Sequence, residues 1–302
     1  MNGLIIRILL MLVAAGAGAY GAIVATARPV RNHPFFQPFL QNGRPVVIAH
    51  RGGGALWPEN TLEGFRGSLA LGADMLEMDT HLTADGVPVV MHDDRVDRTT
   101  NGSGSISDFT LEEIQALDAA FHFSPPNDPD ARPLRGSGIT VPTLRSVFEA
   151  FPEAYIVLEV KDTDPDLVDQ VLALLQEFDR VERTLLGSFH QDVLDRIRTK
   201  DARVATNLSE DEIFPFLIAS WLFQGHLLSP PAEAMLVPTT HGRIPVTTRR
   251  FITAADRRNI FVAPWTINDP EEMKRLIDRG VHGLISDRPD LAVSVVADAV
   301  RE

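Results

Sequence analysis

The sequence predicts an α/β fold of the TIM-barrel type, and three observations favour it. The chain has 302 residues, and about 250 residues are typical of a single (β/α)8 barrel. Short β-rich runs alternate with helical stretches along most of the chain, which indicates a parallel sheet. Polar residues gather at the carboxyl ends of the predicted strands, where barrels of this type carry their functional groups. We therefore expect one barrel domain over residues 45–297.

The first 27 residues differ from the rest of the chain. The stretch Leu4–Ala27 is apolar apart from Arg7, and at about 1.5 Å per helical residue it is long enough to cross roughly 30 Å of hydrocarbon. Two interpretations compete: an uncleaved single-pass membrane anchor, or a signal peptide with small residues at 25–27. The length favours the anchor, which predicts a membrane localisation. Basic residues on both sides leave the orientation undetermined.

The next segment, residues 28–44, contains three prolines and three phenylalanines. It is predicted to be an ordered, non-helical linker. The strands expected after it are Pro45–Ala49, Met75–Thr80, Pro88–His92, Tyr155–Val160, Leu185–Phe189, Val204–Asn207, Met235–Val237, Ile260–Trp265 and Gly283–Ser286. The helices expected between them include Thr61–Leu71, Thr110–Leu117, Asp166–Phe178 and a helix around Pro270–Arg279. Asp85-Gly86 is a hairpin signal, so the run Pro88–His92 is either a barrel strand or a hairpin arm.

Composition limits the function. The formal net charge is −13, which argues against nucleic acid as a partner because that binding needs a basic surface. A phosphate substrate is still possible, since a bound cation can reverse the local field. The chain has no cysteine, so a disulfide framework and thiolate chemistry are excluded.

Three carboxylates are candidate metal ligands. Glu77 and Asp79 lie two apart in a predicted strand and share a face, as do Glu159 and Lys161. Apolar neighbours suggest that both pairs are buried, where charge is costly unless it is paired or metal-bound. Each pair taken alone could be a simple surface or local pairing. Together, three carboxylates at one barrel mouth suit a hard divalent cation.

Other residues at the strand ends suit proton transfer and phosphate binding. His50 and His92 follow apolar runs, and two histidines suit acid–base work near neutral pH, although a single histidine can equally be a core residue. Arg51 and Lys161 suit a phosphate. Trp265 ends another strand and is a candidate substrate contact or a rim-packing aromatic. We interpret the remaining candidates, His81, His122 and His190, as surface or loop residues.

The order of these motifs resembles the glycerophosphodiester phosphodiesterase family. The resemblance covers roughly residues 45–295, and its motifs are His50-Arg51-Gly52, Pro58-Glu59-Asn60-Thr61, Glu77-x-Asp79, Thr83-x-Asp85-Gly86, Val89-Val90-x-His92-Asp93, Arg98-Thr99-Thr100, Pro142-Thr143-Leu144, Glu159-x-Lys161, Ser188-Phe189, Trp265-Thr266-Ile267-Asn268 and Gly283-Leu284-Ile285-Ser286-Asp287-x-Pro289. It implies a TIM barrel with a small insertion, which Arg95–Ile139 would supply.

The resemblance also implies a chemistry. One Mg²⁺ or Ca²⁺ would be held by Glu77, Asp79 and Glu159, with His50 and His92 as the acid–base pair. The attacking group would be the substrate's own glycerol hydroxyl, giving a cyclic phosphate that water then opens. Two substrate classes are expected: soluble glycerophosphodiesters such as glycerophosphocholine, and lysophospholipids. The alternative is a catalytically inactive, membrane-bound phospholipid-binding protein on the same fold.

One segment matches little of that pattern. Residues Pro215–Phe223 are apolar on almost every side of a predicted helix that begins near Phe214. Ser209 and Glu212 resemble a capping box, but Pro215 would then lie inside the helix, where it is unfavourable. The helix is expected either to be buried beneath another element or to dip into a membrane interface beside the lipid substrate.

Overall fold

Eight parallel strands form the centre of the molecule. The computed structural model describes residues 18, 20–22, 24–40 and 43–301. Around the ring, the strands are β1 (Val46–Ala49), β2 (Met75–Leu82), β4 (Tyr155–Val160), β5 (Thr184–Gly187), β6 (Ala205–Thr206), β7 (Ala234–Pro238), β10 (Phe261–Trp265) and β11 (Gly283–Ser286). A sheet runs in the order β11-β1-β2-β4-β5-β6, and β7 pairs with β10 in parallel.

Backbone hydrogen bonds join these two sheets at both seams. Between β6 and β7, Leu208 N donates to Ala234 O at 2.8 Å. Between β10 and β11, His282 N donates to Val262 O and Ile267 N to Ile285 O, each at 2.9 Å. The strands therefore follow one another in a ring, and the predicted TIM-type arrangement is confirmed.

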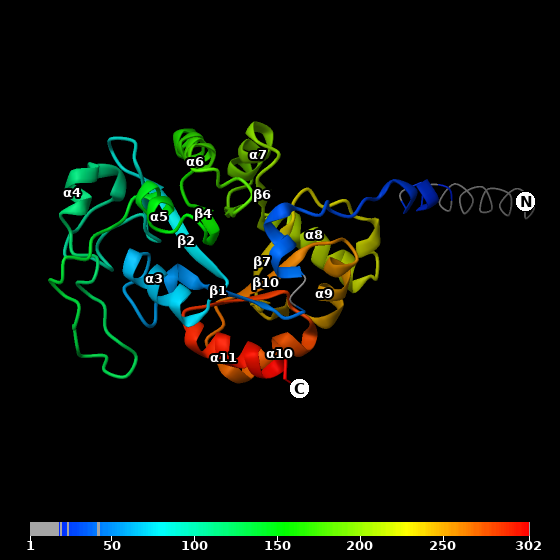
Figure 1. Ribbon diagram of the computed structural model, residues 1–302. Coiled ribbons are helices and arrows are strands. Elements are labelled where there is room, and N and C mark those ends of the chain that lie inside the picture. Colours follow the sequence, from blue (N-terminus) through cyan, green and yellow to red (C-terminus); the bar gives the residue numbers. More distant parts are fainter. Residues whose placement is uncertain (1–17, 19, 23, 41–42, 302) are drawn as a thin grey trace, which may run out of the picture.

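Helices surround the ring of strands (Figure 1). They are α3 (Leu62–Leu71), α5 (Leu144–Ala150), α6 (Pro165–Glu177), α7 (Gln191–Lys200), α8 (Glu210–Trp221), α9 (Arg249–Asp256), α10 (Pro270–Arg279) and α11 (Pro289–Ala299). Most begin at a side-chain cap: Thr61 caps α3 and Asp269 caps α10, each accepting a hydrogen bond from the backbone three residues on. The apolar outer faces of the strands and the inner faces of the helices form the main hydrophobic core.

Residue parity along the strands decides which side chains reach the barrel interior. Val47 and Leu76 belong to the core between strands and helices, whereas Val46, Ile48 and Met75 belong to a second cluster inside the ring. Since side chains alternate along a strand, every second residue after these inner positions also points inward. By this rule, the polar residues at the strand ends also lie on the inner face of the ring.

The segment before the barrel closes its floor. It contains a 3-10 turn, η1 (Pro34–Phe36), and a short helix, α2 (Gln37–Leu40). Phe35 and Phe36 are buried and pack with Tyr155 and Phe261 at ring-centroid distances of 5.6 and 4.8 Å. The prediction of a non-helical linker is therefore wrong, because Pro34 at the first position of the turn favours helical geometry.

The predicted insertion lies between the second and third barrel strands. β3 (Pro88–Val90) pairs antiparallel with β2, so this run is a hairpin arm and not a barrel strand. Arg95–Ile139 follows it with a 3-10 turn, η3 (Ile106–Asp108), and a short helix, α4 (Leu111–Gln115). Buried residues of this segment pack into a small cluster of their own with Val89 and Met91.

The predicted membrane anchor is not supported. Among the described residues, no helix combines the length and apolar character needed to span a bilayer. This finding contradicts the single-pass anchor at residues 1–27 and the membrane localisation inferred from it, and no membrane partner is shown. Most of the apolar stretch, residues 1–17, 19 and 23, lies outside the described residues.

Helix α8 begins earlier than predicted. Its cap is Ser209, which forms a capping box with Glu212, and Pro215 lies inside the helix. Pro215 is tolerated because it and Asp211, whose carbonyl would accept the missing hydrogen bond, are both exposed to solvent. Phe216 and Leu217 are buried against the barrel, whereas Phe214, Ile218 and Trp221 are exposed. The helix therefore has apolar residues on both its buried and its exposed face, and it is not buried beneath another element. Short strands β8 (Thr240–His241) and β9 (Ile244–Pro245) and the turn η4 (Gly225–Leu227) lie between α8 and α9 in the chain.

Candidate active site

A cavity of about 440 Å³ opens at the carboxyl ends of the barrel strands. Its lining includes all eight residues predicted for the site: His50, Arg51, Glu77, Asp79, His92, Glu159, Lys161 and Trp265. Six of them occupy the inner-face positions that parity selects: His50 continues from Ile48, Glu77 and Asp79 from Met75, Glu159 and Lys161 from Val157, and Trp265 from Phe261. The fold therefore brings residues more than 200 positions apart into one site.

The three acidic residues come together as predicted. Asp79 and Glu159 are register partners on the neighbouring strands β2 and β4, and Glu77 lies one inward position before Asp79. One carboxylate oxygen from each of the three lies within 4.8 Å of the others. Oxygen donors in this number and spacing suit a hard divalent cation, so the residues present fit the predicted metal.

The charges of this cluster are costly without a counter-ion. Burial, and then the neighbouring charge of Asp79, raises the pKa of Glu77 to about 8. Burial also raises the pKa of Glu159. Lys161 offsets part of the negative charge, because its Nζ lies 2.8 Å from Glu159 Oε1 and 3.0 Å from Asp79 Oδ1. A cation would lower both carboxyl pKa values by favouring the charged forms.

His50 is held between two carboxylates. Its Nδ1 lies 2.7 Å from Asp287 Oδ1, and its Nε2 faces Glu77 Oε2 at 3.9 Å. Burial disfavours the charged imidazole, but Glu77 and Asp287 outweigh it and raise the pKa of His50. Asp287 is fixed in turn by Asn268 Nδ2, which donates to its other oxygen at 2.9 Å. The Asp287 bond orients the ring so that Nε2 faces the acidic cluster.

A tight turn places Arg51 next to His50. The backbone of Arg51 is left-handed, with φ 50° and ψ 32°, and its N–H donates to Glu77 Oε2 at 2.7 Å. Gly52 follows with φ 72°, and a Cβ there would come within 2.6 Å of the Phe65 ring. Gly52 therefore serves the turn that places Arg51. Arg51 Nε is buried and makes no hydrogen bond within the described part of the chain.

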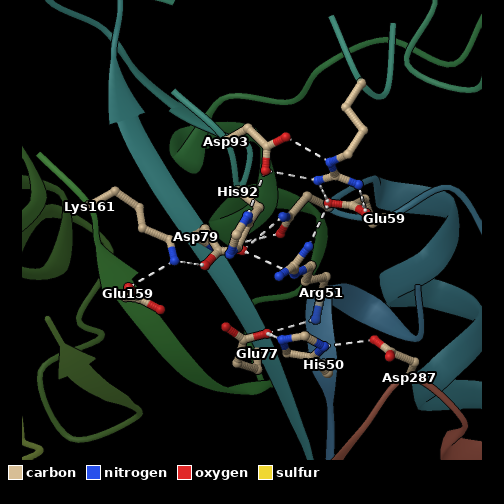
Figure 2. A network of polar contacts seen from close by, with 12 residues as sticks. His50, Arg51, Glu59, Glu77, Asp79, His92, Asp93, Glu159, Lys161 and Asp287 are labelled. Atoms are coloured by element: carbon tan, nitrogen blue, oxygen red, sulfur yellow. Dashed lines mark hydrogen bonds and ion pairs between the residues drawn. The ribbon is translucent and has the colours of Figure 1, made fainter. Parts of the chain in front are cut away.

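His92 lies on the other side of the acidic cluster and is more exposed. Its Nδ1 contacts Asp93 Oδ1 at 2.7 Å (Figure 2). Burial lowers the pKa of His92. Arg98 donates to both oxygens of Asp93, from Nε at 2.6 Å and from Nη2 at 3.0 Å, and holds the pKa of that carboxyl well below its usual range. His50 and His92 thus share one arrangement, an imidazole backed by a carboxylate.

A second set of hydrogen bonds links the first loop, which carries Arg51 and Glu59, to the loop that carries Arg98. Arg98 also donates two hydrogen bonds of 2.7 Å to the carboxylate of Glu59. Glu59 in turn accepts from Arg51 Nη1 at 3.2 Å, a contact that Figure 2 shows. Asn60 Nδ2 donates to Asp79 Oδ2 at 3.0 Å. Glu59 and Asn60 therefore order the first loop.

The rest of the cavity wall is apolar. Trp265 meets Phe189 edge to face, with ring centroids 6.1 Å apart. Beyond this pair the lining is formed largely by α8 and by the strands between α8 and α9: Leu208, Ile213, Phe214, Leu217, Leu236, Val237, Pro238, Ile244 and Val246. We call these nine residues the apolar wall. Sequence reasoning found Trp265 but not this wall, because the segment matched no motif.

Several polar residues of the site were also missed or misread. Asp287, Asp93 and Arg98 were recognised only as parts of motifs, although parity from the inner residue Ile285 would have placed Asp287 in the mouth. The interpretation of His81 as a surface or loop residue is wrong, since it is 5% exposed and its ring contacts Asp162. His81 follows Glu77 and Asp79 at the same spacing of two, and this spacing could have predicted that it shares their buried face. His122 and His190 are exposed, as predicted.

Comparisons with known proteins agree with this geometry. Residues 50–291 match the model of the glycerophosphoryl diester phosphodiesterase family. A glycerophosphodiester phosphodiesterase of Caldanaerobacter subterraneus is 31% identical over 264 residues, covering 84% of this chain and 98% of that protein. Lysophospholipase D GDPD1 of Rattus norvegicus is 27% identical, with 80% of this chain and 83% of that protein covered.

Solved structures show the same fold. The glycerophosphodiester phosphodiesterase of Agrobacterium tumefaciens is 26% identical, with a TM-score of 0.65 over 83% of this chain and 99% of that one. A phosphodiesterase of Oleispira antarctica, solved with its product sn-glycerol-3-phosphate, is 24% identical, with a TM-score of 0.68 over 85% of this chain and 98% of that one. The ring of strands and its helices are thus shared with these proteins.

Proposed function

The chain belongs to the glycerophosphoryl diester phosphodiesterase family and is a phosphodiesterase that acts on glycerophosphodiesters; from this premise we propose which of its residues carry the reaction and which substrates it prefers. The proposal rests on one observation, the convergence of three carboxylates, two carboxylate-backed histidines and two cationic side chains at one cavity. The alternative of an inactive binding protein is disfavoured because every expected catalytic position is filled.

Glu77, Asp79 and Glu159 hold one divalent cation, Mg²⁺ or Ca²⁺. Their oxygen donors and spacing support this assignment. When bound, the cation supplies positive charge to the phosphoryl oxygens as negative charge develops on them. The raised pKa of Glu77 agrees with this assignment, because burial and the charge of Asp79 disfavour its charged form, which a cation would favour.

Arg51 and Lys161 bind the phosphate. Arg51 lines the cavity. Its buried Nε lies 3.9 Å from Asp79 Oδ2 and makes no hydrogen bond within the described residues, so a phosphoryl oxygen is a suitable acceptor for the guanidinium. Lys161 lies between Asp79 and Glu159 and keeps its charge, since both raise the pKa of Lys161 against the effect of burial. Fixed donors of this kind stabilise charge as it builds up in the transition state.

His50 and His92 are the acid–base pair. One takes a proton from the attacking oxygen, which is the glycerol hydroxyl of the substrate, and the other delivers a proton to the leaving alkoxide. Asp287 and Asp93 support this by fixing each ring through Nδ1, which leaves Nε2 for the substrate. The cyclic phosphate formed in this way is then opened by water.

The preferred substrate is a lysophospholipid. The apolar wall supports this preference, because it continues the cavity away from the acidic cluster and suits one acyl chain. Each buried CH₂ group contributes about 0.8 kcal/mol, whereas glycerophosphocholine would leave the wall unused. The rat relative is named for lysophospholipase D activity, which agrees with this preference.

The test compares two substrates with and without metal. Purified protein should hydrolyse both glycerophosphocholine and lysophosphatidylcholine with Mg²⁺ or Ca²⁺, with a higher kcat/KM for the lysolipid. EDTA should abolish both activities, and either cation should restore them. Full activity after exhaustive EDTA treatment would contradict the metal assignment, and equal or better use of glycerophosphocholine would contradict the lipid preference.

A further inference from the structure

His81 is buried directly beneath the loop that carries His92. Its position on β2 is the third inward one in the series Glu77, Asp79, His81, so the same strand face that presents the acidic cluster also presents this imidazole. It does not line the cavity, and it takes no part in the reaction proposed above. A buried histidine with both nitrogens bonded nevertheless suggests a defined structural task.

Both ring nitrogens of His81 contact an oxygen atom of another segment. Nδ1 lies 2.6 Å from Asp162 Oδ1, and Nε2 lies 3.1 Å from the backbone oxygen of His92. A carboxylate and a carbonyl both accept and cannot donate. The ring is therefore held on one side by the Asp162 carboxylate and contacts the backbone of His92 on the other.

Asp162 holds the imidazole in place from the neighbouring strand end. It follows β4 directly after Lys161, and its second oxygen accepts a hydrogen bond of 2.9 Å from Leu82 N. His81 therefore bridges three segments: its own strand β2, the end of β4, and the loop after β3. Of these three segments, the loop after β3 is the one that carries a member of the acid–base pair, His92.

The backbone of His92 itself has few other constraints, although the residue before it is held: Met91 is buried, and its N–H donates to Asp79 O at 3.1 Å. His92 lies in no helix or strand, and within the described residues the bond from His81 is the one hydrogen bond to its carbonyl. Asp93 and Arg98 orient the ring of His92 from the outside, but they are partly exposed. A catalytic group must be held within about 0.5 Å of its productive position. A shift of the His92 backbone would move its imidazole as well, so the backbone must be held too.

We propose that His81, held by Asp162, is a positioning residue for His92, because it fixes the backbone from which that imidazole reaches the phosphodiester. The proposal rests on the proposed role of His92 in acid–base catalysis. A merely structural role is the competing explanation: His81 would then tie β3 to β2 and β4 and contribute only to stability.

The two explanations differ in a double-mutant cycle, because a residue that acts through His92 has nothing left to position once that imidazole is gone. The substrate is glycerophosphocholine, whose alkoxide leaving group needs a proton, so that the assay reports on both members of the acid–base pair. We expect His81→Ala to lower kcat by about 10- to 100-fold, the usual effect of losing a supporting partner, with KM nearly unchanged. Adding His81→Ala to His92→Ala should cost no further activity.

Control variants separate positioning from folding. His81→Gln retains a donor for the His92 carbonyl and should recover part of the lost kcat, whereas Asp162→Asn should reproduce part of the loss without removing the ring. His122→Ala, at an exposed histidine of the insertion, should keep the wild-type kcat. Thermal melts of each variant report its folding.

Three results would overturn the proposal. A loss from His81→Ala that multiplies fully with the loss from His92→Ala would show that His81 does not act through His92. Wild-type kcat in His81→Ala and Asp162→Asn, with His92→Ala inactive, would remove His81 and leave the acid–base assignment standing. Wild-type kcat in His92→Ala would refute the acid–base assignment and this inference together.

Discussion

The two ends of the cavity are built differently. At the charged end, each functional side chain has a specific polar partner: Asp287 for His50, Asp93 for His92, and Asn60 for Asp79. At the apolar wall, side chains such as Phe214 and Leu217 are placed by packing alone, and Phe214 is half exposed. Chemistry requires fixed positions, whereas an acyl chain requires only apolar area of suitable shape.

This contrast predicts different costs for substitution at the two ends. A change at the charged end should reduce turnover of every substrate, since it disturbs groups that act on the phosphodiester itself. A change at the apolar wall should alter the choice between substrates and leave the turnover of small ones nearly intact. Each prediction below would break or sharpen this division, from the largest expected effect to the smallest.

The largest effect is expected at the acidic cluster. Asp79→Asn keeps the shape of a side chain that is 1% exposed but removes a charged ligand, so we expect no measurable turnover of either substrate at any Mg²⁺ or Ca²⁺ concentration. Titration calorimetry should show weakened cation binding. Asp130→Asn, at an exposed carboxyl in the insertion, is the control and should behave as wild type. Wild-type activity in Asp79→Asn would remove this residue from the metal site.

The histidines come next. Losing a positioned acid or base lowers the rate by about 10²- to 10⁴-fold, and we expect a loss in this range for His50→Ala and for His92→Ala, with glycerophosphocholine and lysophosphatidylcholine equally affected. His122→Ala serves as the matched control. Steady-state kinetics with both substrates measure the effect. Near-wild-type turnover in either variant would exclude that residue from the mechanism.

A smaller and selective effect is expected at the apolar wall. Phe214→Asp places a charge where an acyl chain would pack, so kcat/KM for lysophosphatidylcholine should fall about tenfold, which corresponds to about 1.4 kcal/mol. Glycerophosphocholine hydrolysis should stay the same. Phe223→Asp is the control, because Phe223 is 71% exposed and does not line the cavity. Equal losses for both substrates in Phe214→Asp would break the division between the two ends.

The last prediction concerns folding stability and its dependence on pH, not turnover. The Glu77 carboxyl has an ordinary pKa of 4.5 when unfolded, and burial raises its pKa to about 8 in the folded chain. Between these values the folded state holds a proton that the unfolded state has released, so stability should fall as pH rises from 5 to 8. Thermal melts in EDTA should show this fall, and Mg²⁺ should reduce it. The melting temperature of Glu77→Gln should depend less on pH; an unchanged slope would assign the effect to another group.

The charged end was largely predictable because its signals are local in sequence. Glu77 with Asp79 and Glu159 with Lys161 repeat at a spacing of two on apolar strands, which fixes their shared face. The partners that hold them were harder to foresee. Asp287 meets His50 from 237 positions away, and His81 was misread because its burial comes from the hairpin and β4, not from its own neighbours.

The apolar end and the N-terminus show where sequence reasoning failed. Pro215 was expected to begin a helix, but the capping box at Ser209 prevailed because the proline lies on the solvent side. The cavity wall depends on how α8 and the strands after it pack around the barrel, and periodicity alone does not show which helix face borders a cavity. The apolar stretch at residues 1–27 predicted an anchor from length and hydropathy, and no described helix supports it.

The floor of the barrel has a consequence for where the folding unit begins. Phe35 and Phe36 are buried under the ring against Tyr155 and Phe261, and fully burying one phenylalanine contributes about 1.5–3 kcal/mol. A domain boundary drawn at residue 45, as expected from the sequence, would remove these two phenylalanines and leave the two aromatic rings beneath the barrel facing water. Domain exchange with relatives should therefore join the chains before His33, so that the segment that closes the floor stays with its own barrel.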